Sequence, residues 1–548
     1  MPLRRTAVRL SPAAVRPRLA RLLLPALLAA CAVPGLARAE LPAPVGAALA
    51  AAGLPEDAVG ALVIRLEDDR ELVSHRPDAV MQPASTMKLV TTIVGLERLG
   101  PVHRGRTELR ARGEVVDGTL WGDLIVRAGA DPELTWETMQ SMLRMLRDRE
   151  IRRIRGDIVI DRTMFHPIRF DVGVPPFDET PEFRYNVIPD ALLLNFNLLR
   201  FDLESTSNAI KLRMTPQLER VEIATDMTLV DGLCNDWEDG WKPPEVVRKG
   251  NGRLRIVLHG TFPRNCTAGT SLNLLDRTEY ADRLIRRLWR ELGGTIGGTT
   301  REALEPVPLE GTRLLAEHVS RPYADIIRDI NKPSDNTLAR LTYLGLGTLP
   351  LPAALPPAGS PATPAAVPGG GIAASAAAPA QAPSVPSAPA PTLARAETQV
   401  RDWFRLHGID DDGMVIENGS GLSRLERLKP RQLALLLKAA ARSNFAPEFL
   451  SSLPLAGLDG TMRRRLKDSP AAARARIKTG TLRNVVAVGG YVPDSRNRMH
   501  VVVAFINHEQ AVSRVGRPVA DALIDWVARL GSESEAAQAR NERLEAAR

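Results

Sequence analysis

After residue 39 the sequence lacks any apolar run long enough to cross a bilayer, which excludes later membrane spans. Its eight histidines are scattered. His508-Glu509 has no second histidine four residues after His508, which excludes the zinc-metalloprotease motif, and no metal or other cofactor is expected. In "NGSGL" no residue separates Gly419 from Ser420, which excludes the Gly-x-Ser-x-Gly elbow of α/β-hydrolases. A hydrolase of this sequence would therefore need another nucleophile.

The first 39 residues contain no acidic residue but seven arginines. They begin with a basic region, continue with the short apolar stretch "LLLPALLAACAV" and end in Ala37-Arg38-Ala39. This order is typical of a secretory signal cleaved after Ala39. The alternative is lipoprotein processing at Cys31, which follows Leu28-Ala29-Ala30. Pro34 favours cleavage after Ala39, because it breaks the apolar run at the usual distance from such a site.

Removal of this segment changes the charge and the cysteine count. The whole chain carries +8, and the mature chain is near +1 because the segment holds seven of its arginines. Nucleic-acid binding thus loses its main support. Of three cysteines, only Cys234 and Cys266 would remain, and a disulfide between them is the simplest expectation. The alternative is two unpaired thiols.

Along the chain, residues 105–305 are rich in strand-like runs, interrupted by helical patterns at 135–151 and 279–293. Residues 349–392 are nearly all Ala, Pro, Ser and Gly, which predicts a disordered or polyproline-like linker. The last apolar runs predict an antiparallel three-stranded meander followed by a helix at 517–530.

The stretch "PASTMKLVTT" places Lys88 three residues after Ser85. Residues three apart share one face of a helix, so the Lys88 amine can reach the Ser85 hydroxyl. A lysine acts as a base only when burial or a nearby cation lowers its pKa. The alternative is a helix cap followed by a surface lysine, which a lone Ser-x-x-Lys favours.

Two further motifs lie downstream. "KPSDNTLAR" contains Ser334 and Asn336, whose hydroxyl and carboxamide could relay a proton and hold a peptide; the alternative is a helix start capped by Ser334 or Asp335. "RIKTGTL" contains Lys478, which would supply the second cation that lowers the pKa of Lys88; the alternative is a strand with an exposed lysine. In this strand Gly480 would let backbone approach a ligand, while Thr479 and Thr481 could bind a carboxylate.

In this order the three motifs resemble those of the penicillin-recognising serine transferases, which comprise the DD-peptidases and serine β-lactamases. About 245 residues separate Lys88 from Ser334. An insert of this size resembles the penicillin-binding protein 4 family, as do "ENGSGLSR" (417–424) and "LPLAGLDGTM" (453–462). The resemblance implies an α/β (α+β) fold: an antiparallel sheet flanked by helices, a helical lobe and a large β-rich insert.

The resemblance also implies a division of the chain. We expect a signal peptide (1–39), a DD-peptidase domain in three parts (40–104, 306–348 and 393–530), an insert of two nested domains (105–305), the Pro/Ala-rich linker (349–392) and a polar tail (531–548).

By resemblance, Ser85 is the nucleophile, Lys88 its general base and Ser334 a proton relay. Asn336 would hold the substrate backbone and orient Lys88, while Lys478 and the residues after it, Thr479, Gly480 and Thr481, would bind the substrate. The backbone N–H groups of Ser85 and Thr481 would form the oxyanion hole.

The implied activity is that of a D-Ala-D-Ala carboxypeptidase and DD-endopeptidase, exported to the periplasm, which acts on peptidoglycan peptides and is acylated by β-lactams. Peripheral membrane association and a homodimer are compatible with the resemblance. Two alternatives stay open: a β-lactamase or esterase of the same fold, which the large insert disfavours, and a non-catalytic cell-wall binding protein.

Overall fold

The computed structural model describes residues 41–351 and 390–532. The predicted signal segment 1–39, with both of its alternative processing sites, lies outside the described residues, as do most of the predicted linker 349–392 and of the tail 531–548. Within the described part, none of the helices combines the length and the apolar character that a membrane span needs.

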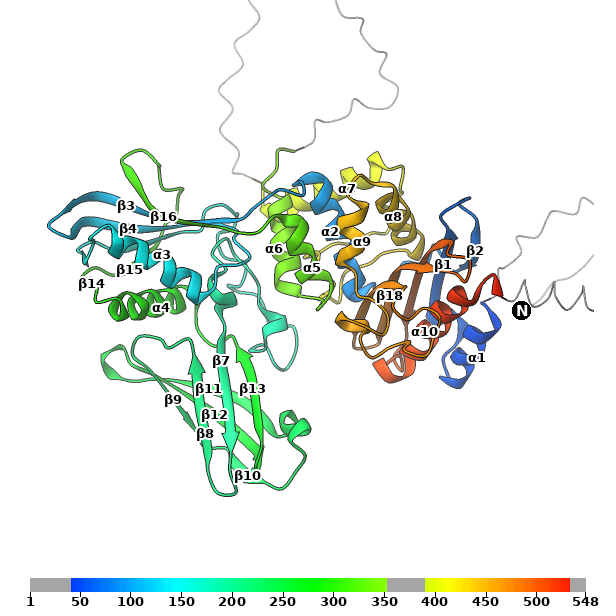
Figure 1. Ribbon diagram of the computed structural model, residues 1–548, viewed down its shortest axis with the longest axis horizontal. Helices are drawn as coiled ribbons and strands as arrows, with labels where there is room; N and C mark the ends of the chain where they lie inside the picture. The colour runs from blue at the N-terminus through cyan, green and yellow to red at the C-terminus, as the bar shows by residue number, and fades with distance from the viewer. Residues whose placement is uncertain (1–40, 352–389, 533–548) are drawn as a thin grey trace, which may run out of the picture. The chain divides into compact units, whose positions relative to one another are not determined.

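The sheet that carries the third motif has five antiparallel strands in the order β17-β18-β19-β1-β2. Figure 1 labels β18, β1 and β2 of this sheet. Its strands are β1 (Val59–Arg65), β2 (Glu71–His75), β17 (Arg476–Leu482), β18 (Val485–Pro493) and β19 (Met499–Asn507). The predicted C-terminal meander is therefore confirmed. The two N-terminal strands extend it, because β1 pairs with β19 along its whole length.

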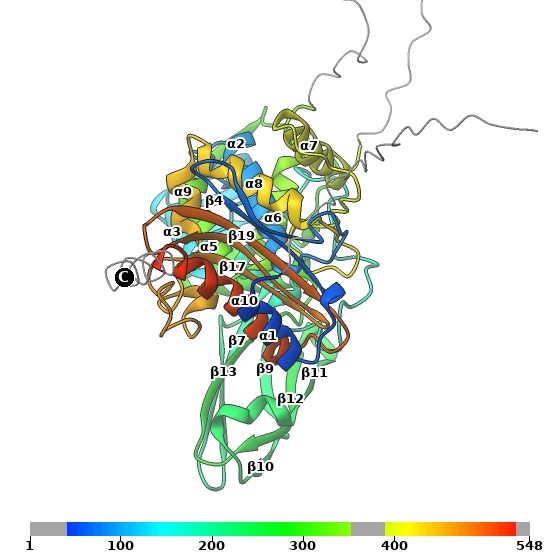
Figure 2. The same cartoon turned by 90° about the vertical axis from the view of Figure 1, so that its right-hand side faces the viewer.

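Both faces of this sheet are covered, which explains why β1, β18 and β19 are mostly apolar rather than alternating with polar residues. In β1, Leu62 and Ile64 belong to one core and Val63 to the other. On the Val63 side, α1 (Ala43–Ala51) and α10 (Ser513–Arg529) lie together over the sheet (Figure 2). The sheet is thus sandwiched between helices, as predicted.

The opposite face packs against α8 (Pro430–Arg442), and α2 (Met87–Arg98) meets it at Leu89, whose side chain lies beside Gly489 of β18. Around α2 lies a helical lobe made of α5 (Tyr323–Asn331), α6 (Asn336–Leu346), α7 (Thr392–Leu406) and α9 (Ala446–Ser452). All ten residues of α2 from Met87 to Leu96 are buried, so this helix is the centre of the lobe.

Between α2 and α5 the chain forms three further sheets. A seven-stranded sheet contains β3 (Arg106–Val116), β4 (Thr119–Gly129), β5 (Arg153–Ile154), β6 (Ile158–Asp161), β14 (Thr295–Ile296), β15 (Thr300–Glu302) and β16 (Thr312–Val319). The helices predicted at 135–151 and 279–293 are α3 (Trp136–Asp148) and α4 (Arg277–Glu291).

The two remaining sheets are formed by a segment whose strands all lie between β6 and β14 in the sequence. One contains β7 (Leu199–Ser205), β8 (Ile210–Thr215) and β13 (Thr267–Leu272); the other contains β9 (Val221–Thr225), β10 (Thr228–Val230), β11 (Trp241–Arg248) and β12 (Leu254–Pro263). Short 3-10 helices complete the chain: η1 (Glu56–Ala58), η2 (Ala84–Thr86), η3 (Arg184–Asn186), η4 (Leu194–Asn197), η5 (Cys234–Gly240), η6 (Gly250–Gly252) and η7 (Gly460–Met462).

The predicted disulfide joins Cys234, at the start of η5, to Cys266, one residue before β13. Closing a loop of this length stabilises the folded state by roughly 3–4 kcal/mol in the chain-entropy model. The bond lies within the segment that forms β7 to β13, so it stabilises this segment rather than the three motifs.

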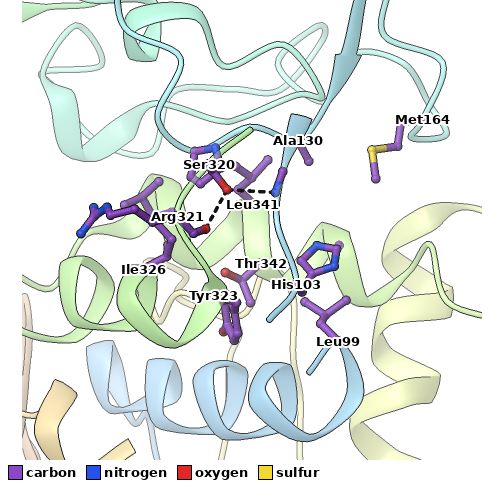
Figure 3. Close-up of a pocket in the computed structure, with 14 residues that line it drawn as sticks. Leu99, His103, Ala130, Met164, Ser320, Arg321, Tyr323, Ile326, Leu341 and Thr342 are labelled. Atoms are coloured by element: carbon purple, nitrogen blue, oxygen red, sulfur yellow. Dashed lines mark hydrogen bonds between the residues drawn. The ribbon is translucent and has the colours of Figure 1, made fainter. Parts of the chain in front are cut away.

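The chain enters and leaves the insert at two adjacent segments. The backbone N–H of Gly105 donates to Ser320 Oγ (3.0 Å), and the N–H of Ser320 donates to the Gly105 carbonyl (3.0 Å). Gly105 and Ser320 also line a small cavity of about 40 Å³, together with residues such as His103 and Tyr323 (Figure 3). None of Ser85, Lys88, Ser334, Asn336 and Lys478 lines it.

Candidate active site

The three sequence motifs, which are hundreds of residues apart, meet at the N-terminus of α2. Ser85 lies in η2, the turn before α2, and Lys88 in the first turn of α2. Lys478 lies in β17, which packs against η2. Ser334 precedes α6, and Asn336 is its first residue. The residues predicted to act together are therefore brought together.

Two glycines allow the chain to surround the Ser85 turn closely. A Cβ on Gly480 would lie 2.9 Å from both the Pro83 carbonyl oxygen and the Ser85 nitrogen. On Gly421 it would lie 2.0 Å from the Ala84 carbonyl oxygen. We expected Gly480 to admit a ligand, but what it admits in this structure is the Ser85 turn itself.

Lys88 is completely buried and its amine has three oxygen neighbours. Its Nζ lies 3.0 Å from Ser85 Oγ and 2.6 Å from Asn336 Oδ1, and it also donates to the Ser420 carbonyl. The Asn336 amide is oriented by its other end, since Nδ2 donates to the Tyr185 carbonyl (3.0 Å). A surface lysine beside a helix cap is therefore the wrong interpretation: α2 has no side-chain cap, and Lys88 is inside the protein.

The pKa of Lys88 is lowered to about 7, mainly by burial and to a smaller extent by the cation of Arg340, against the opposing effect of the Asp335 and Glu426 carboxylates. The sequence-based interpretation that Lys478 lowers this pKa is wrong in its cause, because desolvation dominates. Lys478 is buried as well, and burial together with the charge of Lys88 lowers the pKa of Lys478.

Lys478 of the third motif is hydrogen-bonded to Ser334 of the second motif. Its Nζ donates to Ser334 Oγ (2.7 Å) and to the Thr479 carbonyl (2.8 Å), both neutral oxygens. Ser334 has a φ of +65°, a left-handed conformation that costs free energy for a residue with a Cβ. Asp335, rather than Ser334, caps α6, since its carboxylate accepts the Leu338 N–H (2.9 Å). The capping interpretation is thus right for Asp335. Because Ser334 does not cap the helix, its hydroxyl can accept the hydrogen bond from Lys478.

Sequence reasoning missed a buried carboxylate behind Lys88. Glu426 is 1% exposed, and its Oε1 accepts the backbone N–H groups of Asn418 (3.1 Å) and Gly419 (3.0 Å). These bonds fix the loop whose next carbonyl, that of Ser420, faces Lys88. Burial raises the pKa of Glu426, whereas the N–H donors and Lys88 oppose the rise. No local pattern marks Glu426, because its partners are defined only by the fold.

The cleft in front of Ser85 has a volume of about 360 Å³. Ser334, Thr479 and Thr481 line it together with Ser85, so the predicted substrate-binding hydroxyls face the predicted nucleophile. Within the described residues, no group of three or more His, Cys, Asp or Glu side chains is arranged to hold a metal ion.

Comparisons with known proteins identify the family of the chain. The sequence pattern of the D-Ala-D-Ala carboxypeptidase 3 (S13) family matches residues 41–353 and 384–530. The chain is 25% identical over 461 residues to the D-alanyl-D-alanine carboxypeptidase DacB of Haemophilus influenzae, covering 83% of this chain and 86% of that protein. It is 26% identical to a D-alanyl-D-alanine carboxypeptidase of an Actinomadura species, over 79% of this chain and 75% of the relative.

The fold has a counterpart among solved structures. The crystal structure of penicillin binding protein 4 from Haemophilus influenzae superposes with a TM-score of 0.69, at 22% identity, over 88% of this chain and 99% of that one. The fold predicted by resemblance is therefore confirmed. Because the family pattern covers nearly all of the chain after residue 40, the chain belongs to the D-Ala-D-Ala carboxypeptidase 3 (S13) family.

Proposed function

We propose that this protein is a serine DD-peptidase that cleaves the D-Ala-D-Ala bond of peptidoglycan stem peptides, and the corresponding bond of cross-links, through an acyl-enzyme at Ser85. The same serine would be acylated by penicillin. The observation that carries the proposal is the contact between Ser85 Oγ and a fully buried Lys88 amine whose pKa is about 7. The names and activities of the relatives point in the same direction.

The hydrogen-bond partners of Lys88 suit a general base. Asn336 Oδ1 and the Ser420 carbonyl can only accept hydrogen bonds, so they take both N–H bonds of a neutral amine. The lone pair then faces the third neighbour, the Ser85 hydroxyl. In the proposed step Lys88 takes the hydroxyl proton as Ser85 Oγ bonds to the carbonyl carbon. Backbone N–H groups of Ser85 and Thr481 would stabilise the resulting oxyanion.

Collapse of this intermediate breaks the peptide C–N bond, and the leaving nitrogen needs a proton. We assign its delivery to the Ser334 hydroxyl, which takes a proton in turn from Lys478 through their hydrogen bond. In the later hydrolysis step, the attacking water would give a proton back to Lys478 through Ser334, and Lys88 would return its proton to Ser85 Oγ as the ester bond breaks. Asn336 would hold the peptide backbone, and Lys478 with Thr479 and Thr481 would bind the terminal carboxylate. Water then hydrolyses the acyl-enzyme and restores Ser85.

The assay that tests this function measures D-alanine release from a peptide ending in D-Ala-D-Ala, together with labelling by a fluorescent penicillin. The wild-type protein should do both, and Ser85→Ala should do neither while retaining its thermal unfolding transition. Labelling of the variant, or the lack of either reaction in the folded wild-type protein, would overturn the proposal. Rapid release of hydrolysed penicillin would indicate a β-lactamase instead.

Glu426 should tune the pH dependence of this reaction. Its carboxylate raises the pKa of Lys88, so removing the charge should lower that pKa further. In Glu426→Gln the amide oxygen can still accept the N–H groups of Asn418 and Gly419. We therefore expect the acid limb of the acylation rate to move to lower pH by up to about one unit.

The measurement is the rate of penicillin acylation between pH 5 and 9 in wild type and Glu426→Gln, on protein with matched unfolding transitions. A change in rate at all pH values without a shift of the midpoint would assign Glu426 a structural role only. A shift to higher pH would contradict the sign of the electrostatic argument.

We further propose that the protein is exported and acts in the periplasm, and that the chain divides into the domains expected from the sequence with one boundary moved: the insert runs on from 305 through β16, because this strand pairs with β3. The segment that would carry the export signal, 1–39, lies outside the described residues. Peripheral membrane association and a homodimer stay predictions.

A further inference from the structure

One wall of the cleft in front of Ser85 is strongly basic. The ten residues that line the cleft include four arginines and no aspartate or glutamate. The arginines are Arg463, Arg464 and Arg465, which follow η7, and Arg517 in α10.

Only one of these arginines has a carboxylate partner. Arg465 pairs with Asp521 of α10, with Nη2 2.6 Å from Oδ1 and Nε 3.1 Å from the same oxygen. Arg463, Arg464 and Arg517 are exposed, and within residues 41–351 and 390–532 their side chains form no ion pair or hydrogen bond. Three cations without counter-ions thus share one cleft, which favours the binding of an anion.

The loop that carries this wall is held in place on both sides. Before the arginines, Thr461 Oγ1 lies 2.8 Å from Thr479 Oγ1, and the Thr461 N–H donates to the Lys332 carbonyl (3.1 Å). After them, Arg465 ties the loop to Asp521. Because the loop is already ordered, binding of a ligand to it costs little backbone conformational entropy.

The position of the wall identifies the part of the substrate that would meet it. In the function proposed above, on which this inference rests, Thr479 and Lys478 bind the carboxylate of the leaving group. The Thr461–Thr479 contact places the arginines beyond that carboxylate, on the leaving-group side. A leaving D-alanine has only this one carboxylate, whereas the leaving strand of a cross-link continues as a peptide with further carboxylates.

We propose that Arg463, Arg464 and Arg517 bind an additional carboxylate on the leaving peptide strand of cross-linked substrates. Guanidinium groups suit this ligand, because their paired N–H donors match the two oxygens of a carboxylate. The wall therefore favours cleavage of cross-links over release of single D-alanine residues.

The test compares wild type with the triple variant Arg463→Gln, Arg464→Gln, Arg517→Gln on two substrates: a pentapeptide ending in D-Ala-D-Ala and a purified cross-linked peptide dimer. The ratio of kcat/KM for the dimer to that for the pentapeptide should fall by about tenfold or more, mainly through KM. Added salt should lower the wild-type ratio and affect the variant less.

A matched control removes three arginines in and just after α3: Arg144→Gln, Arg149→Gln and Arg152→Gln. These residues are exposed and lie outside the cleft. The control should keep the wild-type ratio. An unchanged ratio in the wall variant, or an equal fall in the control, would overturn this inference. Labelling by fluorescent penicillin separates the two proposals: a labelled protein with an unchanged ratio contradicts only the wall, whereas absent labelling of wild type contradicts the proposed function.

Discussion

Replacement of Lys88 by methionine should slow acylation of Ser85 roughly 10³-fold, within the range that general-base catalysis contributes. Methionine approximates the length of the lysine side chain but has no amine to take the serine proton. Because Lys88 is fully buried and its charged form is disfavoured by desolvation, the variant should fold at least as stably as wild type.

The pH profile of the wild-type protein provides an independent check on Lys88. Below its pKa of about 7 the amine is protonated and has no lone pair for the Ser85 proton. The acylation rate should therefore rise with pH and approach a plateau above the midpoint near pH 7. Lys249→Met, which changes an exposed lysine of the insert, should keep both the rate and the midpoint. A midpoint near that of an ordinary lysine, or an unaffected rate in Lys88→Met, would contradict the role of Lys88.

Replacement of Lys478 by alanine should lower kcat/KM by roughly 10²–10³-fold on peptides that end in a free carboxylate. Lys478 is buried, and its contacts to Ser334 Oγ and the Thr479 carbonyl provide no negative charge. Burial lowers its pKa well below the ordinary value. A substrate carboxylate would supply the missing counter-ion, so we expect binding to be coupled to proton uptake by Lys478.

A second substrate distinguishes carboxylate binding by Lys478 from a purely structural role of Lys478. The same peptide with a C-terminal amide lacks the negative charge, so Lys478→Ala should affect its hydrolysis at least about tenfold less. Lys211→Ala, an exposed lysine of β8, should affect neither peptide. Equal losses on the acid and the amide would mean that Lys478 acts only by holding Ser334.

The sequence predicts those parts of the molecule whose signals are local. The apolar runs of β17, β18 and β19 predict a meander, and the motif residues are recognisable because each motif occupies a few consecutive positions. The pairing of β1 with β19 could not be read from either strand, since it depends on which of several apolar strands meet after the chain has passed through the insert.

The environment of Lys88 shows the same limit. Its contact with Ser85 follows from helical spacing, but its contacts with Asn336 and the Ser420 carbonyl join residues 248 and 332 positions apart. Its burial, which sets its pKa, results from the packing of the whole lobe. This is why the sequence indicated a lowered pKa but could not decide between burial and a nearby cation as its main cause, and why Glu426 was missed.

The most direct test of the account is to locate a penicillin adduct by mass spectrometry. The full chain would be incubated with penicillin, quenched, weighed intact and then mapped by proteolysis. We expect one adduct per chain, on the Ser85 side chain, and none in Ser85→Ala. An adduct on any other residue, or a folded wild-type protein with no adduct at any quench time, would contradict the assignment of Ser85 as the nucleophile.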